Sequence, residues 1–577
     1  MSSIAQLVID RAQDDNLAIR VDDSTWTYRE FTQACATRAA FFASLKTDRP
    51  SMRTPSTPAA TKIGALASPP DQILVTPPHI GLLLENVAEF PMWLGAAAIA
   101  GATIVGINPT RRGAELARDI TFTECQIVVT ETSQAHLLDG LDLGPASAPG
   151  RRLNVDSADY VETLKPFADA TLPAAVPDPS TQFLLVFTSG TSGAPKAVIF
   201  SQARLHRMGT TLAGMVQLGP DDVSYSVMPL FHSNGLVTSW LPTLAVGATL
   251  ALRRKFSASN FLPDVRRYGA TYFNYVGKPL AYVLATPELP DDADNTLRRG
   301  YGNEGAEADI KRFMARFNCK IDDGYGSTES SVAIQRTPDT PTGSLGRAAP
   351  TVCIVNADTG VECIRARFDA HGRITNPDEA VGEIVNTAGA ELFEGFWNNE
   401  EANTQRIRGT SYWSGDLGYR DEAGFFYFAG RSSEWLRVDG ENIAAAPIER
   451  IMSRFPGVLL NAVYGVPDAD VGDRVMVAVQ MDGRAFNAEA FSAFLSEQSD
   501  LGPKWHPTYV RVVTAFPMTE TNKVVKRHLQ RDRWESSNPT YHSGGIDKPY
   551  VRIDSGAIQQ IRAHFESRGR LSALDPI

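Results

Sequence analysis

The sequence predicts an α/β fold. We expect a large N-terminal domain, with parallel βαβ sheets and a small β-rich part, followed by a small α+β C-terminal domain. Over the first half of the chain, short apolar runs alternate with segments of helical periodicity, which is typical of parallel sheets covered by helices. Beyond Thr342 the pattern changes to short strands and turns. A chain of 577 residues is also too long for one hydrophobic core, so at least two domains are expected.

The first elements can be placed in order along the chain. A helical pattern begins near Thr27 and continues to about Leu45. The segment 47–78 is rich in Pro, Ser, Thr and Ala and lacks periodicity, so we interpret it as a surface loop or a mobile insertion. Strand and helix patterns then alternate in the following segments: 79–84, 88–100, 103–107, 113–121 and 126–130.

The later elements lead to a domain boundary. A buried strand is expected at 183–187 and a helix at about 201–216, and the alternation continues up to Asp323. An aromatic strand at 425–429 ends at Gly430 and Arg431, where the composition becomes charged. We therefore predict an N-terminal domain, a C-terminal domain and an extension with these bounds: 1–430, 431–534 and 535–577.

Composition and charge narrow the class of protein. Hydrophobic residues make up 43% of the chain and charged residues 21%, which is typical of a soluble globular protein. The net charge of −11 argues against non-specific binding to nucleic acid, which needs an excess of Lys and Arg. The five cysteines lack metal-like spacing and indicate reduced thiols of a cytoplasmic enzyme.

Neither a signal peptide nor a transmembrane segment is predicted. Residues 1–16 carry charges and lack a continuous apolar region. The most apolar stretch, 91–108, contains three glycines and barely reaches the length needed to cross a bilayer. We interpret it as a buried helix followed by a strand, and peripheral contact with a membrane stays open.

The most informative motif follows the apolar strand at 183–187. Residues 188–197 are Thr-Ser-Gly-Thr-Ser-Gly-Ala-Pro-Lys-Ala. Glycines let backbone N–H groups approach an anion, hydroxyls add donors, and Lys196 adds a positive charge. This is not a Walker loop, because its glycines are three apart and Ala197 follows the lysine. Such turns are often only connections, but the concentration of these residues predicts a loop that holds a polyphosphate such as ATP.

This loop resembles the phosphate-binding motif of the adenylate-forming superfamily, which includes acyl-CoA synthetases, luciferases and the adenylation domains of peptide synthetases. The resemblance extends from about residue 15 to about residue 530 and shows in several ordered motifs. It implies a mobile C-terminal domain and a loop that covers the β- and γ-phosphates of ATP. The residues that it implies to contact the nucleotide are Thr188, Ser189, Gly190, Thr191, Ser192, Gly193 and Lys196. Of these, Thr188 is also implied to be catalytic and Thr191 to be a magnesium ligand.

A second motif, Asp-Gly-Tyr-Gly-Ser-Thr-Glu at 323–329, is a glycine-hinged turn that presents an aromatic ring, hydroxyls and a carboxylate. Taken alone, such a sequence is more often a turn than a site. The resemblance implies that Tyr325 stacks on adenine, Thr328 contacts the α-phosphate and Glu329 holds Mg²⁺, which prefers carboxylate and phosphate oxygens. Five further residues are implied to lie at the nucleotide. Gly326 and Ser327 belong to this turn, and Gly302, Asn303 and Glu304 belong to the loop that flanks adenine.

Three more polar residues match motifs of the superfamily. Asp416, in the segment 412–418, matches the aspartate that accepts both ribose hydroxyls, and Arg431 matches an arginine that contacts ribose or phosphate. His232 lies in Pro-Leu-Phe-His-Ser-Asn-Gly and matches a histidine next to the acyl carboxylate. We expect His232 to shape the substrate site rather than act as a base, because a carboxylic acid is already ionised at neutral pH.

The C-terminal domain supplies the last candidates. In the superfamily a lysine of the final motif bridges the substrate carboxylate and the α-phosphate, and by position this is Lys523, with Lys526 as the rival. Asn522 stands where a glycine is usual, and Ser433 stands at the hinge position where Asp or Lys is common. The resemblance places Gly440, Glu441 and Asn442 towards the pantetheine arm of coenzyme A.

The resemblance implies an ATP-dependent acyl-CoA synthetase. It would adenylate a carboxylic acid, with Mg²⁺, and pass the acyl group to coenzyme A. The region around His232 and the segment 440–449 resemble fatty-acyl-CoA synthetases of the long-chain and fatty-acid-transport type. This resemblance implies a medium- or long-chain fatty acid, with a bulky steroid side-chain acid as the second candidate. Apolar residues at 275–283 suit an aliphatic tunnel and core packing equally well. The sequence also leaves open transfer to a carrier protein, a binder that has lost catalysis, and a luciferase-like oxygenase.

Overall fold

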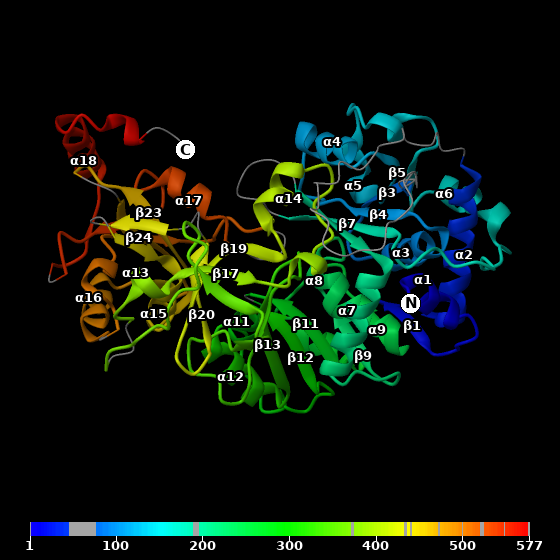
Figure 1. The fold of residues 1–577 in the computed structure, drawn as a ribbon, viewed down its shortest axis with the longest axis horizontal. Helices are drawn as coiled ribbons and strands as arrows, with labels where there is room; N and C mark the ends of the chain where they lie inside the picture. Colours follow the sequence, from blue (N-terminus) through cyan, green and yellow to red (C-terminus); the bar gives the residue numbers. More distant parts are fainter. Residues whose placement is uncertain are drawn as a thin grey trace. The chain divides into compact units, whose positions relative to one another are not determined.

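The computed structural model describes most of the chain, and its helices and strands follow the predicted alternation (Figure 1). The segment 47–78 lies outside the described residues apart from 77 and 78. Internal contacts divide the chain into two compact units, the first built mainly from residues 1–275 and the second mainly from residues 302–393 and 401–577. The described ranges are 2–45, 77–188, 196–277, 279–370, 374–431, 435–438, 441–470, 473–498, 500–519, 524–546 and 548–574.

The first unit contains a six-stranded sheet in the order β6-β5-β3-β4-β7-β8. All neighbouring strands run parallel except β7 and β8, which form an antiparallel pair. The central strands β3, β4 and β5 are buried along their whole length, which explains their nearly continuous apolar sequences. The strands are β3 (His79–Leu83), β4 (Thr103–Gly106), β5 (Cys125–Thr130), β6 (Arg152–Asn154), β7 (Gln182–Thr188) and β8 (Lys196–Ser201).

A second set of strands in this unit has the order β11-β9-β10-β1-β2, parallel except for the β1–β2 hairpin. The predicted parallel α/β architecture is therefore confirmed. The strands are β1 (Leu17–Val21), β2 (Ser24–Thr27), β9 (Val223–Ser226), β10 (Thr249–Leu252) and β11 (Tyr272–Val276).

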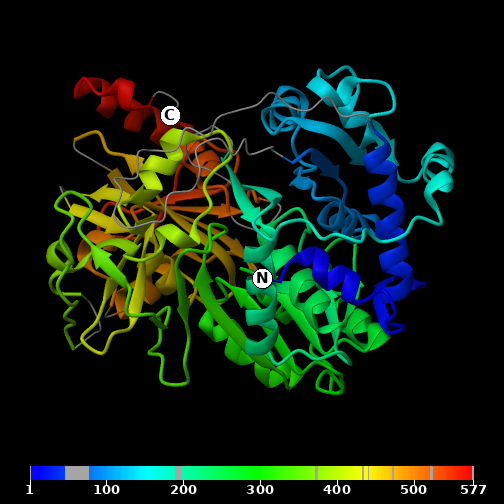
Figure 2. The same ribbon diagram turned by 45° about the vertical axis from the view of Figure 1, so that its right-hand side comes forward.

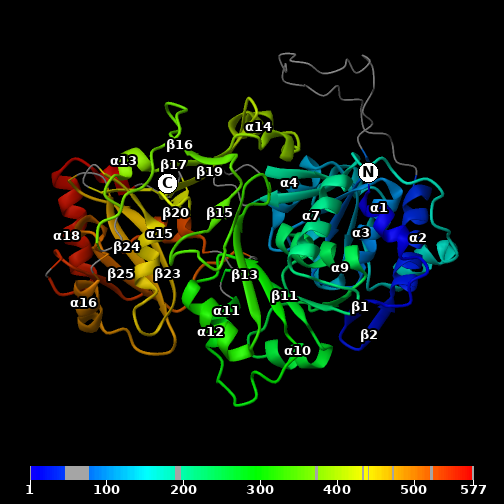
Figure 3. The same ribbon diagram turned by 60° about the horizontal axis from the view of Figure 1, so that its bottom comes forward.

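Helices cover these sheets where the periodicity predicts them. The helix expected near Thr27 begins with a capping box: Thr27 Oγ1 accepts a hydrogen bond from Glu30 N, and the Glu30 carboxylate accepts one from Thr27 N. Helix α2 packs against α3 (Figures 1 and 2), and α7 packs against α9 (Figure 3). The helices are α1 (Ile4–Asp10), α2 (Tyr28–Ser44), α3 (Glu89–Ala100), α4 (Gly113–Phe122), α5 (Thr132–Ala135), α6 (Ala158–Leu164), α7 (Gln202–Met215), α8 (Ser233–Gly235), α9 (Leu241–Val246) and α10 (Phe261–Tyr268).

The apolar stretch 91–108 forms part of α3 followed by β4, as predicted. Within the described ranges, no helix has both the length and the apolar character needed to cross a membrane. The five cysteines all lie in described segments, are buried and form no disulfide.

The second unit contains β13 and β14, which form an antiparallel hairpin, and the short strand β15. The predicted β-rich part follows as an antiparallel sheet of β16, β17, β19 and β18, with β20 on β19. The strands are β13 (Lys320–Gly326), β14 (Ala333–Gln335), β15 (Arg347–Ala348), β16 (Val352–Val355), β17 (Gly382–Asn386), β18 (Ile407–Arg408), β19 (Ser411–Arg420) and β20 (Phe426–Arg431). The helices are α11 (Pro279–Leu284), α12 (Glu307–Phe317) and α13 (Pro377–Ala380), while β12 (Arg299–Asn303) and α14 (Glu400–Arg406) cross the division between the units.

The C-terminal part of this unit is α+β, as predicted. A hairpin of β21 and β22 precedes a five-stranded sheet in the order β23-β24-β25-β26-β27. The strands are β21 (Trp435–Val438), β22 (Glu441–Ala444), β23 (Val458–Pro467), β24 (Asp473–Met481), β25 (Tyr509–Val513), β26 (Thr540–His542) and β27 (Val551–Arg552). The helices are α15 (Ala445–Met452), α16 (Ala488–Glu497), α17 (Lys526–Asp532) and α18 (Ser555–Ser567).

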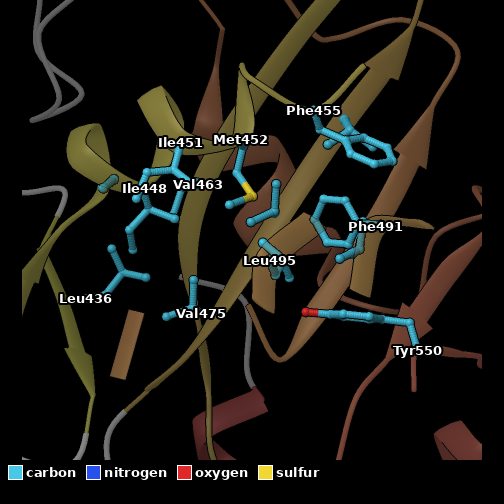
Figure 4. Close-up of a cluster of buried hydrophobic side chains, with 14 of the residues drawn as sticks. Leu436, Ile448, Ile451, Met452, Phe455, Val463, Val475, Phe491, Leu495 and Tyr550 are labelled. Carbon is cyan, nitrogen blue, oxygen red and sulfur yellow. The ribbon is translucent and has the colours of Figure 1, made fainter. Parts of the chain in front are cut away.

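The extension beyond residue 534 is built into this part of the fold. Its strand β26 pairs with β25, and its Tyr550 lies in the apolar cluster formed by α15, α16 and the sheet (Figure 4). Phe565 of α18 packs in a second cluster that also contains Trp534. The extension therefore contributes two strands, a helix and core side chains.

Candidate functional site

In the first unit, β7 and β8 hold the two ends of the predicted phosphate loop together. Thr188 and Lys196 are register partners at the end of this hairpin where the loop begins, and Thr188 Oγ1 donates to the Lys196 carbonyl oxygen at 3.3 Å. The Lys196 ammonium lies 5.9 Å from the centre of the Phe396 ring. Five predicted phosphate contacts lie outside the described residues: Ser189, Gly190, Thr191, Ser192 and Gly193.

A second segment braces β8, and the sequence reasoning missed it. Ile199 N donates to the Gly395 carbonyl oxygen at 2.9 Å. The Glu394 carboxylate accepts hydrogen bonds from Ser201 N and Ser201 Oγ, both at 2.6 Å. Glu394 is nearly two hundred residues away in the sequence, so no local pattern could have identified it. This bracing fixes the strand that carries Lys196.

The turn that carries His232 is held by a buried asparagine that sequence reasoning also missed. Asn86 donates to the Met228 carbonyl oxygen at 3.1 Å and accepts from Leu230 N at 2.9 Å. Gly235 is required here, because a Cβ at this position would lie 2.3 Å from the Pro229 carbonyl oxygen. His232 is half-buried and precedes helix α8. The Pro-Leu-Phe-His-Ser-Asn-Gly motif is therefore a rigid turn.

Behind this turn the helix geometry is unusual. Residues Leu236–Trp240 form a π-helical stretch, a feature found frequently at functional sites. Asn234 accepts a hydrogen bond from Asn274 Nδ2 at 2.8 Å, and Thr238 Oγ1 donates to the Asn234 carbonyl oxygen at 2.7 Å. These buried polar contacts fix the residues that follow His232.

In the second unit, the loop predicted to flank adenine is joined to the motif at 323–329. Asn303 Nδ2 donates to the Gly324 carbonyl oxygen at 2.7 Å, and Gly305 N donates to Asp323 Oδ2 at 3.0 Å. Glu304 is exposed and has a positive φ of 63°, whereas Gly302 is buried. The structure therefore brings two separately predicted motifs together.

Tyr325 and Asp416 meet directly. The Tyr325 hydroxyl donates to Asp416 Oδ2 at 2.5 Å, although the two residues belong to different predicted motifs. Burial, followed by the negative charge of Asp416, raises the pKa of the Tyr325 phenol well above 10. Asp416 N in turn donates to Ser414 Oγ at 3.1 Å. This cluster presents an aromatic ring and a carboxylate side by side, which suits a nucleoside.

Glu329, the predicted magnesium ligand, is buried in the turn between β13 and β14, with 8% of its surface exposed. Burial, followed by the charge of Glu329, raises the pKa of the Tyr412 hydroxyl on β19 well above its usual range. Ser331 Oγ donates to the Glu329 carbonyl oxygen at 3.2 Å and Asn386 Nδ2 to the Ser331 carbonyl oxygen at 2.7 Å. The remaining residues of the turn, Ser327 and Thr328, are half-buried, and Gly326 is exposed.

The donor set fits Mg²⁺ held jointly with phosphates. In the part of the chain that the structure describes, no group of three or more His, Cys, Asp or Glu residues could hold a metal ion by itself. Mg²⁺ is commonly bound by one or two carboxylates together with substrate phosphates. A single buried carboxylate, Glu329, satisfies that requirement.

The third motif forms the bulged strand β19. Gly415 has φ 75°, and its N–H donates to Glu383 Oε1 at 2.6 Å. Asp416 pairs in register with Arg431 of β20, so the two predicted ribose contacts are neighbours on one sheet. The side chain of Arg431 lies outside the described parts of the structure.

In the C-terminal part, the structure separates the two rival lysines. Lys526 Nζ lies 2.9 Å from Glu449 Oε1, which also accepts a hydrogen bond from Val463 N at 2.9 Å. Lys526 therefore ties α17 to α15. Lys523 and Gly440 lie outside the described residues, and Glu441 and Asn442 are described only as backbone of β22.

Comparisons with known proteins agree with the motifs. The model of the AMP-binding enzyme family matches residues 75–397, and that of the AMP-binding enzyme C-terminal domain matches residues 447–523. A steroid-22-oyl-CoA synthetase of Rhodococcus jostii is 46% identical over 574 residues, which are 99% of this chain and 98% of the relative. A medium/long-chain-fatty-acid–CoA ligase, FadD17, of Mycobacterium marinum is 50% identical over 466 residues, which are 81% of this chain and 88% of the relative.

Solved structures share the fold. ATP-bound MatB from Rhodopseudomonas palustris superposes with a TM-score of 0.74 at 22% identity, covering 92% of this chain and 98% of that one. A benzoate CoA ligase from Burkholderia xenovorans gives a TM-score of 0.74 at 21% identity, covering 92% of this chain and 100% of that one. These likenesses establish the fold.

Proposed function

Since the chain belongs to the AMP-binding enzyme family and is an ATP-using acid–CoA ligase, we propose that its substrate is a lipophilic carboxylic acid. The acid would first be adenylated and then transferred to coenzyme A. The lipophilic character of the acid is supported by the relatives named steroid-22-oyl-CoA synthetase and medium/long-chain-fatty-acid–CoA ligase. The adenylation step is supported by the contact between Tyr325 and Asp416, which joins two predicted nucleotide motifs in one cluster. We also propose a cytoplasmic location, in keeping with five cysteines that form no disulfide.

In the first step the carboxylate attacks the α-phosphorus of ATP, and pyrophosphate leaves. One anion attacks another, so the barrier falls when positive charge and fixed geometry are supplied. Lys196 and Lys523 would supply positive charge, and Thr188 and Thr328 would donate hydrogen bonds to phosphate oxygens. Magnesium held by Glu329 and Thr191 would neutralise phosphate charge. The rigid turn at His232 would bound the carboxylate site.

In the second step the thiolate of coenzyme A attacks the acyl carbon of the mixed anhydride, and AMP leaves. We propose that the C-terminal domain rotates between the steps, withdraws Lys523 and brings the segment 440–442 to the site. Conformational steps of this kind often limit turnover.

Two classes of acid are candidates. A medium- or long-chain fatty acid is supported by the relative named medium/long-chain-fatty-acid–CoA ligase, at 50% identity. A steroid side-chain acid is supported by the relative named steroid-22-oyl-CoA synthetase, whose match takes in 99% of the chain. Because this match covers 99% of the chain, it includes most of the two regions that depart from the superfamily pattern, 47–78 and 535–577.

Thioester formation tests the proposal. The enzyme would be incubated with ATP, Mg²⁺ and coenzyme A, together with acids that range from acetate to long-chain fatty acids and steroid carboxylates. We expect thioester and pyrophosphate with the lipophilic acids, and the ranking of kcat/KM separates the two classes. Adenylate formation that never proceeds to a coenzyme A thioester would favour a carrier protein as acceptor. Failure of every acid to support ATP–pyrophosphate exchange would contradict the proposal.

A further inference from the structure

The hydrogen bond between Tyr325 and Asp416 has a consequence for nucleotide recognition. We propose that Tyr325 is a positioning residue whose hydroxyl holds the Asp416 carboxylate in the orientation that accepts the ribose hydroxyls. This inference rests on the proposed function. It adds that recognition of the base and recognition of the ribose are physically coupled through one hydrogen bond.

The first argument concerns the freedom of the carboxylate. Asp416 is 8% exposed and follows Gly415, whose positive φ marks a bulge in β19. Its backbone is fixed by the hydrogen bond from Asp416 N to Ser414 Oγ, and Ser414 Oγ in turn donates to the Ile384 carbonyl oxygen at 2.7 Å. The donor from Tyr325 fixes the plane of the carboxylate itself.

The second argument concerns stoichiometry. Each carboxylate oxygen can accept two hydrogen bonds. The Tyr325 hydroxyl uses one acceptor position of Asp416 Oδ2. A vicinal diol needs two acceptors that point in the same direction. A carboxylate whose plane is held by a fixed donor is preorganised for that diol, and preorganisation lowers the cost of binding.

The third argument concerns the donor. The Tyr325 side chain lies on β13, where Tyr325 pairs in register with Ile334, and its ring lies 6.3 Å from the Phe428 ring. Burial and the adjacent charge keep the pKa of the phenol well above 10. Tyr325 therefore remains a neutral donor at physiological pH. The same ring is the one implied to stack on adenine, so one side chain serves both halves of the nucleoside.

Tyr325→Phe isolates the hydroxyl, because phenylalanine keeps a ring that can stack. Affinity would be measured as the KM for ATP and for 2′-deoxy-ATP in acid-dependent pyrophosphate exchange, and independently as the rise in melting temperature that each nucleotide produces. We expect the KM for ATP to rise about tenfold, as for the loss of one hydrogen bond to a charged group. The KM for 2′-deoxy-ATP should change much less, so the preference for ribose should shrink.

Asp416→Asn and the double variant complete the cycle. If Tyr325 acts through Asp416, adding Tyr325→Phe to Asp416→Asn should have little further effect on either nucleotide. The matched control is Tyr427→Phe. Tyr427 lies on β20, next to the strand that carries Asp416, and its hydroxyl also donates to an aspartate, Asp421, at 3.2 Å. The control should leave the ribose preference unchanged.

Three results would overturn the inference. These are an unchanged ratio of the two KM values in Tyr325→Phe, additive effects in the double variant, and an equal loss in Tyr427→Phe. Wild-type exchange activity tests the proposed function separately. An active wild type with an unchanged ratio would reject the role of Tyr325 alone, whereas an inactive wild type would reject the proposed function. The melting-temperature measurement requires no turnover and decides the role of Tyr325 in either case.

Discussion

Asp119 is a buried carboxylate that the proposed chemistry does not use. It lies in α4 with 1% of its surface exposed, and neither carboxylate oxygen has a hydrogen-bond partner among the described residues. Its nearest cation is Arg111, whose Nε lies 3.4 Å from Asp119 Oδ2. Burial outweighs this attraction and raises the pKa of the carboxyl to about 6.

The sign of the resulting pH dependence follows from linkage. The folded state holds the Asp119 proton more tightly than the unfolded state, whose pKa is about 3.9. The contribution of Asp119 to the free energy of unfolding is therefore fully present below about pH 4 and is lost as the pH rises to about 6. We expect Asp119→Asn to stabilise the protein at pH 7 by about 2 kcal/mol and to remove this part of the pH dependence.

Melting temperatures between pH 4 and pH 7.5 would check this prediction. Glu115→Gln is the matched control, because Glu115 bonds the same Arg111 at 3.0 Å on the exposed side of the helix. It should change stability by no more than about 0.5 kcal/mol. If Asp119→Asn were less stable than the wild type at pH 7, or if its melting temperature depended on pH as that of the wild type does, the raised pKa of Asp119 would be contradicted.

At the scale of elements, Arg316 joins α12 to the end of α11. Its side chain and that of Asp292 are 7% and 4% exposed, and Arg316 Nε donates to Asp292 Oδ2 at 2.6 Å. The same guanidinium donates to the Thr286 carbonyl oxygen at 3.0 Å and to the Pro287 carbonyl oxygen at 2.8 Å. One arginine therefore satisfies the carbonyl groups that follow α11.

Arg316→Met should destabilise the protein by about 3–5 kcal/mol, because Asp292 would remain buried without its cation. Adding Asp292→Asn should recover part of this loss. Arg312→Met, an exposed position of the same helix, is the control and should be nearly neutral. Denaturant unfolding measures all four proteins, and a loss in Arg316→Met that matches the control would show that the pair contributes little.

Elements and motifs differ in how far the sequence predicts them. Apolar runs predicted β3, β4 and β7 because these strands are buried on both faces, and the start of α2 follows from a capping box that is local in the sequence. The contacts that position the site are long-range. Asn86 bonds the His232 turn across more than a hundred residues, and Glu394 bonds β8 across nearly two hundred. No periodicity or spacing encodes such contacts.

The same limit applies within the site. The resemblance to the superfamily identified Tyr325 and Asp416 separately, each through its own motif. Their hydrogen bond depends on the pairing of β13 with β14 and on the bulge in β19, which tertiary structure sets. Five predicted residues of the phosphate loop, 189–193, and Lys523 lie outside the described residues, so their roles stay predictions.

At the scale of the whole molecule, the C-terminal domain and the extension form one folded body. Tyr550 packs among residues of α15 and α16, and its hydroxyl donates to the Pro507 carbonyl oxygen. Phe565 and Trp534 share the second cluster. A rotation of the C-terminal domain during catalysis would therefore carry the extension with it.

Lys523 tests that rotation, because it should act in only one half-reaction. Lys523→Ala should slow adenylation by roughly two to three orders of magnitude, the usual loss for one electrostatic donor in a transition state. Thioester formation from a pre-made acyl adenylate should be largely retained, since the rotated domain no longer uses this lysine. Pyrophosphate exchange measures the first half-reaction, and release of AMP from the adenylate with coenzyme A measures the second.

Lys526→Met is the control, because Lys526 is held by Glu449 at 2.9 Å and ties α17 to α15. It should lower stability while leaving the ratio of the two half-reaction rates close to that of the wild type. If Lys526→Met, and not Lys523→Ala, slowed adenylation selectively, the catalytic lysine would be Lys526 and its ion pair with Glu449 would have to open during turnover. If Lys523→Ala slowed both half-reactions equally, the lysine would not be withdrawn between them, and a single domain arrangement would have to serve both steps.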